Sequence, residues 1–201
     1  MIPSVPECFR LMSRYGMLEN IRDHSIIVAR VAALLAEQVN RAGLQLAPDL
    51  IVASALLHDI GKTACLDNDL DHALEGERIC REHGMPEIAA IVGDHVRLRN
   101  FVLPRITENE LVFYADKRVT HDRVVSLDQR RVYIIERYGR NDPARRAAIE
   151  RHCRRWQSLE DEIFRFIEFS PAELAVLVDP DPSNCKYLSA GESTTCMTSA
   201  D

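Results

Sequence analysis

The sequence predicts an all-α protein built as one domain, and three observations lead to this fold class. Apolar residues recur at helical spacing along most of the chain. Glycine and proline are scarce, with 8 and 9 residues, which disfavours a turn-rich β sandwich. A length of 201 residues with 46% hydrophobic content suffices for one substantial core and is short for two domains.

Two helices are predicted in the first third of the chain. Residues 21–41 read as a long helix. One of its faces carries four apolar residues: Ile27, Val31, Leu34 and Leu35. Pro48 suits the first turn of a second helix, and residues 50–57 contain only one polar side chain, Ser54. A helix that apolar is expected to be central and buried on every side.

Two shorter helices are predicted next. Asp69 is the expected N-cap of a third helix that ends near Gly84. Pro86 fits the first turn of a fourth helix, which runs to about His95.

The second half of the chain predicts further helices. Thr107 and Glu110 form a capping-box signature for a helix that runs to about Val119. Residues 132–135 are apolar and fit strand or helix by periodicity, and the neighbouring pattern favours helix. Pro143 opens the last long helix. Its expected buried stripe comprises Ile149, Trp156, Leu159, Ile163 and Phe166. From residue 180 the chain is small and polar without periodicity, which predicts a disordered tail.

The composition excludes several classes of protein. The net charge of −6 and the isoelectric point near 5.7 argue against a general nucleic-acid binder, which carries a basic surplus. No stretch reaches the ~18 consecutive apolar residues of a membrane span, and the first residues lack the apolar region of a secretory signal. Six cysteines without a CxxC pair indicate reduced thiols in a cytoplasmic protein.

Polar residues occupy positions that helix geometry should bury. His24 shares a helical face with Val28 and other apolar residues. His58 and Asp59 end the most hydrophobic helix, and Asp116 lies on a core-facing stripe. One buried histidine is usually a satisfied core residue, but buried aspartates are costly unless they are paired or bind a metal. No basic residue lies among the apolar positions of these three stripes, so the sequence favours a mixed nitrogen and oxygen metal site.

Two further histidines extend this site. His72 lies four residues before Gly76, whose missing side chain would let another group approach the helix closely. His95 lies on the apolar face of the fourth helix. Both imidazoles could hold a second metal that shares the Asp59 carboxylate, since two metals ~3.5–4 Å apart can clamp a phosphoryl group.

Four short strings resemble the HD superfamily of metal-dependent phosphohydrolases. They are HDIGK at 58–62, HALEG at 72–76, GDH at 93–95 and YADKRV at 114–119. The resemblance covers about residues 20–125 and includes the defining H…HD…D pattern, carried by His24, His58 with Asp59, and Asp116. His72 and His95 resemble the extra histidines of the binuclear branch. No match to the GYP-type motif of cyclic di-GMP enzymes is present, which makes that substrate less expected.

The resemblance implies a mechanism and an all-α HD-type bundle around a metal centre. The first metal would be held by His24, His58, Asp59 and Asp116, and the second by Asp59, His72 and His95. Water on the metal would attack phosphorus, with Asp59 orienting it and Lys62 meeting the substrate phosphate. The cofactor is then one or two divalent ions, for which iron, manganese, cobalt, nickel and zinc all suit the ligands.

The resemblance also implies a division of the chain. Residues 1–20 would be an N-terminal extension, 21–125 the HD core, 126–179 additional helices packing on that core, and 180–201 the tail. The expected partner is a small phosphorylated, nucleotide-like substrate, with no nucleic acid and no membrane. A homodimer is left open, since the Trp156 stripe fits either core or a dimer surface. Two alternative functions stay open: a di-iron oxygenase of the same fold, and a non-catalytic sensor of nucleotide or metal.

Other charged residues are weaker candidates. Five basic residues flank the expected ligands, and one or two of them could hold phosphate or ribose: Arg97, Arg99, Lys117, Arg118 and Arg123. Glu75 and His83 are expected at a helix surface and a helix C-terminus, and His121 at the surface or the cleft. His152 has no supporting pattern. The six arginines between residues 140 and 155 are expected on the solvated face of a helix.

Overall fold

The computed structural model describes residues 1–178 as helices joined by turns, with one small sheet. The helices are α1 (Val5–Arg14), α2 (Glu19–Arg41), α3 (Pro48–Leu57), α4 (His72–Glu82), α5 (Pro86–Asp94), α6 (Glu108–Lys117), α7 (Leu127–Ile134), α8 (Pro143–Ile163) and α9 (Leu174–Leu177). Strands β1 (Val119–Thr120) and β2 (Arg123–Val124) pair antiparallel. The predicted all-α class is confirmed. The predicted tail, residues 180–201, lies outside the described residues.

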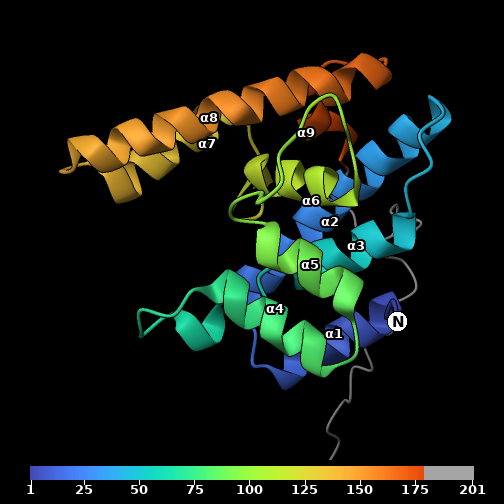
Figure 1. Ribbon diagram of the computed structural model, residues 1–201, viewed down its shortest axis with the longest axis vertical. Coiled ribbons are helices and arrows are strands. Elements are labelled where there is room, and N and C mark those ends of the chain that lie inside the picture. Colours follow the sequence, from blue (N-terminus) through green and yellow to red (C-terminus); the bar gives the residue numbers. More distant parts are fainter. Residues whose placement is uncertain (179–201) are drawn as a thin grey trace, which may run out of the picture.

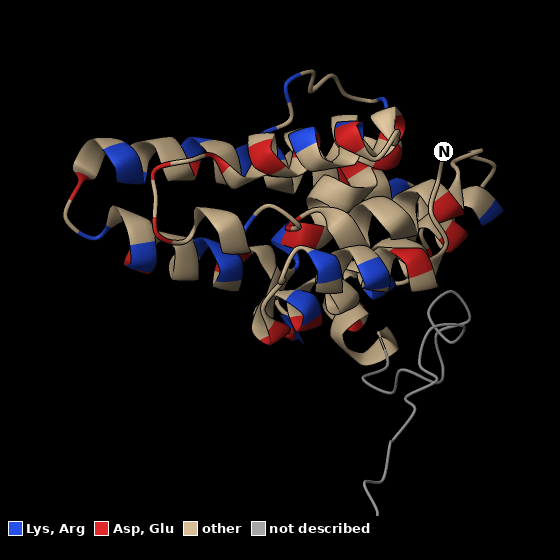
Figure 2. Cartoon of the chain, turned by 90° about the horizontal axis from the view of Figure 1, so that it is seen from below, with Lys and Arg blue, Asp and Glu red and all other residues tan. Residues whose placement is uncertain are grey.

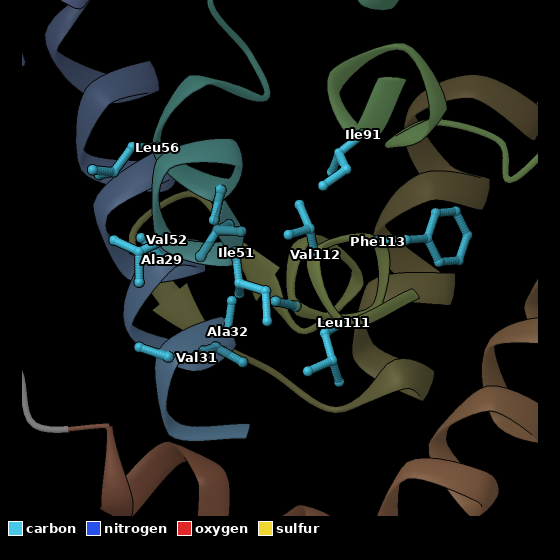
Figure 3. Close-up of a cluster of buried hydrophobic side chains, with 14 of the residues drawn as sticks. Ala29, Val31, Ala32, Ile51, Val52, Leu56, Ile91, Leu111, Val112 and Phe113 are labelled. Carbon is cyan, nitrogen blue, oxygen red and sulfur yellow. The ribbon is translucent and has the colours of Figure 1, made fainter. Parts of the chain in front are cut away.

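The core lies between helices in the middle of the molecule. α2 packs along α3, and α6 packs against both (Figure 1). Figure 3 shows apolar side chains of α2, α3, α5 and α6 gathered in this region. Every residue from Ile51 to Leu57 is buried, which confirms the prediction that this helix is surrounded by protein. Because α3 ends inside the core, the two residues that follow it, His58 and Asp59, are buried as well.

The first 20 residues contain a helix that belongs to the folded body. Ser4 and Glu7 form a capping box at the start of α1. Cys8 and Met12 on this helix are fully buried in the main core. α1 packs against α3, so this segment covers one side of the helix that leads to His58.

Two predicted helix ends are wrong. The N-cap of α4 is Asp71 and not Asp69, because the Asp71 carboxylate accepts a hydrogen bond from the backbone N–H of Ala73 at 2.9 Å. α6 ends at Lys117 instead of continuing to Val119. Val119 begins β1 because the chain turns back at His121, whose backbone has a positive φ of 55°.

Helices α7 and α8 form an antiparallel arm that projects beyond the core, and we call residues 127–163 the arm (Figure 1). A π-helical turn at Ile135–Gly139 joins α7 to the loop before α8. The predicted helical state of residues 132–135 is confirmed. The buried Arg118 fastens α8 to α6, because it donates to Glu160 at 2.9 Å and to the Tyr114 hydroxyl at 2.6 Å.

The structure of residues 1–178 bears on two expectations from the sequence, the absence of a membrane span and the state of the cysteines. No helix in this part of the chain is both long and apolar enough to cross a membrane. The cysteines in the same part are free thiols: Cys8, Cys65, Cys80 and Cys153. Burial raises the pKa of the Cys8 and Cys80 thiols to about 12, so both stay protonated at neutral pH.

Candidate metal centre

The ends of several helices bring the expected ligands together. His24 lies in α2 and Asp116 in α6. His58 and His95 each follow the last residue of a helix, α3 and α5, and Asp59 follows His58. These five side chains are buried, with residue exposures of 7% or less. Their convergence depends on α2, α3, α5 and α6 packing as one core.

A first cluster joins α2, α3 and α6. Nε2 of His24 lies 3.1 Å from Oδ1 of Asp116, and Nε2 of His58 lies 3.8 Å from the same oxygen. His58 Nε2 is also 3.4 Å from Oδ2 of Asp59. Ligand atoms of His24, His58 and Asp59 all lie within 4.8 Å of one another, a spacing at which they could share one ion.

A second cluster lies on the other side of Asp59. Oδ1 of this carboxylate is 3.5 Å from Nε2 of His72 and 3.5 Å from Nε2 of His95. The two imidazole nitrogens are 3.2 Å apart. The side chain of His72 is 30% exposed, so this cluster is the one nearer to solvent. Asp59 is therefore common to both clusters.

Three histidines are held in one orientation by backbone carbonyl groups. Their Nδ1 atoms face the carbonyl oxygens of His121 for His24 (2.8 Å), Ala55 for His58 (2.7 Å) and Val92 for His95 (2.6 Å). Because a carbonyl oxygen only accepts, each Nδ1 carries the hydrogen and donates it. In this tautomer the lone pair of each Nε2 points into the cluster, as binding to a metal requires.

Two atoms of the site are buried without a hydrogen-bond partner: Nε2 of His58 and Oδ1 of Asp59. Buried polar atoms are normally paired, because leaving one unpaired costs about 1–3 kcal/mol. Divalent cations held by these residues would satisfy both atoms. Neutral imidazole nitrogens and carboxylate oxygens are donors that first-row metal ions accept. The residues present therefore fit a metal ion.

A close glycine contact positions His72. A β-carbon on Gly61 would lie 2.6 Å from the backbone nitrogen of Gly76 and 2.6 Å from the carbonyl oxygen of His72. A β-carbon on Gly76 would meet Val92 at 2.7 Å. The prediction that Gly76 permits a close approach is thereby confirmed. This contact seats the start of α4 directly against the turn that carries Asp59.

The aspartates also have basic partners, contrary to the sequence-based expectation. Lys62 donates to Oδ2 of Asp59 at 2.7 Å. The buried Lys117 donates to Oδ2 of Asp116 at 2.5 Å and to the carbonyl oxygen of His95 at 2.9 Å. Lys117 directly follows Asp116 in the chain and therefore lies off the apolar stripe that carries Asp116. Oδ1 of Asp59 faces His72 and His95, while Oδ2 accepts from Lys62 and also lies near His58.

The electrostatics of the site favour charged carboxylates at Asp59 and Asp116 and a neutral imidazole at His72. Burial would raise the pKa of Asp59, but the neighbouring imidazoles and Lys62 hold it well below its usual value. Burial acts in the same way on Asp116, where the positive charges of Lys117 and Arg130 lower the pKa more strongly. Burial and the proximity of His95 lower the pKa of His72 to about 4. At neutral pH this imidazole is therefore uncharged, and one of its two ring nitrogens is available as a metal ligand.

The centre opens into two cavities that share part of their lining. The larger cavity, of about 590 Å³, reaches Asp59, His72, His95 and Asp116. Its basic lining residues are Lys62, Arg97, Lys117, Arg130, Arg145 and His152. A second cavity of about 270 Å³ reaches His24. Four residues line both cavities: Lys62, Arg130, Ile134 and Tyr138.

Two of the five basic residues expected near the ligands line the larger cavity, namely Arg97 and Lys117. Arg99 and Arg118 are engaged in ion pairs with acidic residues. Arg123 is an exposed residue of β2.

Two other weak candidates, Glu75 and His83, lie at the helix surface and the helix C-terminus, as expected from the sequence. Glu75 forms an ion pair with Arg78 on the surface of α4. His83 is the C-cap of the same helix and shares a hydrogen bond of 2.9 Å with the hydroxyl of Tyr15.

Three cavity residues were missed from the sequence: Arg130, Arg145 and His152. A signal for two of them was present. Arg145 and His152 share a helical stripe with Ile149 and Trp156, at spacings of four and three residues. Since Trp156 was expected to face inward, the same stripe places both polar residues toward the core side of α8. Arg145 is exposed, as expected for the arginine-rich segment, and it also lines the larger cavity.

The helical fold and the paired histidine and aspartate clusters define a protein with a candidate centre for divalent metal ions. Residues 21–120 match the family model of the HD domain. The chain belongs to the HD domain family through this segment, which confirms the resemblance derived from the motifs. The HD domain supports assignment to a family of metal-dependent phosphohydrolases.

The chain is also similar to several longer proteins. It is 28% identical over 165 residues to the tRNA (cytidine(56)-2'-O)-methyltransferase of Thermoplasma volcanium, covering 73% of this chain and 45% of that protein. It is 32% identical to Ribonuclease Y of Rhodopirellula baltica (78% of this chain, 25% of the relative) and 31% identical to that of Pseudothermotoga lettingae (88% and 32%). The chain thus spans less than half of each of these relatives. No solved structure matches it.

Proposed function

We propose that this protein hydrolyses a phosphate ester or phosphoanhydride bond in a small nucleotide-like substrate, with one or two divalent metal ions. The observation that carries the proposal is the pair of clusters that share Asp59, with buried atoms left unpaired at their centre. This centre opens into a cavity lined by basic residues. Such an arrangement suits an anionic substrate whose reacting group lies against the metal site.

Each residue of the centre has a distinct task in this proposal. One metal would be held by His24, His58, Asp59 and Asp116, and a second by Asp59, His72 and His95. When bound, these ions would supply an activated water and charge stabilisation for a phosphoryl group. Lys62 holds Oδ2 of Asp59, and Oδ1 of the same carboxylate has no hydrogen-bond partner and faces His72 and His95. Lys117 fixes Asp116 relative to the backbone of His95, and so ties the two clusters together.

Arg130 is the residue best placed to bind the substrate phosphate. It lines both cavities, and its Nη2 atom is 3.7 Å from Oδ1 of Asp116. Its Nε atom is buried and has no hydrogen-bond partner. A phosphoryl oxygen would satisfy that donor and place the phosphorus next to the ligands. Lys62 faces the same space and adds positive charge.

The cavity walls supply apolar contacts that suit a nucleoside. Ile134, Ile149 and Trp156 line the larger cavity, and Tyr138 is shared by both. An aromatic ring on a cavity wall can stack on a base. The net charge of −6 favours a small nucleotide over a nucleic acid. A second candidate is an RNA phosphodiester, which is favoured by the relatives named Ribonuclease Y and by the arginines along the arm (Figure 2).

The proposal is tested by product release from a substrate panel in the presence of manganese or iron. The panel contains nucleoside monophosphates, dinucleoside polyphosphates, cyclic dinucleotides and a short RNA. The Asp59→Ala variant should lose both metal content and turnover, because Asp59 is common to both clusters. Asp69→Ala, which removes an exposed carboxylate outside the centre, is the matched control and should retain both.

The alternatives give different results in the same experiment. Full activity in Asp59→Ala would refute the proposed centre. Oxygen consumption by the iron-loaded protein without phosphate release would favour the oxygenase. Metal binding without either reaction would favour a sensor.

A further inference from the structure

The charges that line the larger cavity do not balance. Its acidic lining residues are Asp59 and Asp116, which belong to the metal centre. Lys62 and Lys117 are paired with these carboxylates. Two other lining cations have no ion pair with any residue in the described range 1–178: Arg97 and Arg145. The part of the cavity away from the metal centre therefore carries uncompensated positive charge.

The unpaired cations lie on two different elements that face the same space. Arg97 follows α5 and lies two residues after His95. Arg145 and His152 are seven residues apart on α8, which is about 10 Å along a helix. Ile149 and Trp156 lie on the same stripe and form an apolar wall beside them. The arm thus brings charged and apolar groups to the side of the cavity opposite the core.

His152 lines the same cavity as these cations. Burial lowers its pKa, and four neighbouring cations lower it further: Arg97, Arg155, Arg151 and Lys117. The imidazole is therefore neutral at neutral pH, and it can donate one hydrogen bond to an anion without carrying a charge itself. Arg97 and Lys117 line the same cavity as His152.

We propose that Arg97, Arg145 and His152 form a second anion subsite, which binds a phosphate group of the substrate other than the one held at the metal centre. Guanidinium groups bind phosphate oxygens through two parallel hydrogen bonds, and Arg97 and Arg145 are both exposed to an incoming ligand. This inference rests on the proposed function, because it assumes that the reacting phosphate lies against Asp59 and its neighbours. It narrows the substrate class to molecules with two separated phosphate groups.

The subsite predicts a preference that one pair of ligands can measure. The dinucleotides UpU and pUpU contain the same internal phosphodiester, and only pUpU has an additional terminal phosphate. Binding is measured by titration calorimetry with the full chain in the presence of manganese. We expect pUpU to bind about tenfold or more tightly than UpU, since hydrogen bonds to charged groups contribute about 1.5–3 kcal/mol each.

Alanine variants of two arm residues test whether the arm causes the preference for pUpU. Arg145→Ala and His152→Ala should each reduce the affinity for pUpU several-fold and leave the affinity for UpU unchanged. Arg154→Ala is the matched control, because Arg154 is an exposed arginine on α8 that does not line the cavity. This control should bind both ligands as the unmodified protein does. Folding of each variant is checked by its thermal unfolding midpoint.

Several results would overturn the subsite. Equal binding of UpU and pUpU to the unmodified protein refutes it, and so does a failure to bind either ligand. A loss of affinity for both ligands to the same extent in Arg145→Ala also refutes it. Preference for pUpU without hydrolysis of any substrate would leave the subsite standing and refute the proposed function. The two proposals can therefore fail separately.

Discussion

Replacing Gly61 with alanine tests how the second cluster is positioned. The added β-carbon would lie 2.6 Å from the backbone nitrogen of Gly76 and from the carbonyl oxygen of His72. Backbone atoms cannot rotate away, so the start of α4 must move by about 0.8 Å to reach an ordinary contact of 3.4 Å. Metal sites tolerate deviations of only about 0.2 Å in ligand distance. His72 should therefore leave the second cluster.

The first cluster should be unaffected by this change, because none of its ligands lies on α4. We expect Gly61→Ala to bind one metal ion fewer per chain than the unmodified protein. Overpacking should also lower the free energy of unfolding by about 1–3 kcal/mol. Metal content is measured by mass spectrometry after dialysis against manganese, and stability by urea denaturation.

Gly139→Ala is the matched control for this measurement. A β-carbon at Gly139 would have its nearest contact at 3.4 Å, with Arg146, so no element has to move. This variant should keep its full metal content. An unchanged metal content in Gly61→Ala would show that the glycine contact does not position His72, and equal losses in both variants would refute the reasoning as well.

Three further predictions concern the second cluster, acid stability and the arm. His95→Ala should lower the bound metal by one ion per chain, and an unchanged content would make His95 a structural residue. In the metal-free protein the pKa of His72 is about 4, whereas an unfolded histidine titrates near 6.5, so the unfolded state binds more protons between these values. The thermal midpoint should therefore fall as the pH is lowered from about 6.5 to about 4, and fall less in His72→Gln; equal slopes would contradict this. Glu160→Ala leaves the buried Arg118 unpaired and should cost about 3–5 kcal/mol in urea denaturation, while Glu162→Ala breaks an exposed pair and should cost less than about 1 kcal/mol.

The helices of the core were largely predictable from local patterns. The capping box of Thr107 and Glu110 marks the start of α6, and Pro48 and Pro86 open α3 and α5. These signals are local because they depend on backbone groups within one turn of the helix end. The hairpin after α6 was missed, since Val119 continues the apolar spacing and only the turn at His121 shows that the helix has ended.

The candidate ligands were also predictable, because their motif lies in short strings and on apolar helical faces. The partners of these ligands were not. Lys117 is adjacent to Asp116 in the chain, and helical periodicity places adjacent residues about 100° apart, so its bond to Asp116 depends on how its flexible side chain folds back. Only the packed structure shows that Lys117 also reaches the backbone of His95.

The sequence by itself determined the helical class, the HD motif and the residue types able to bind a metal. The tertiary structure decided which face of the arm meets the metal centre. Arg130, Arg145 and His152 come from a segment far along the chain from His58 and Asp59, and no local pattern relates the two segments. They line one cavity because the ion pair of Arg118 with Glu160 fastens α8 to the core. Long-range contacts of this kind depend on packing between distant segments, and spacing along the chain does not encode them.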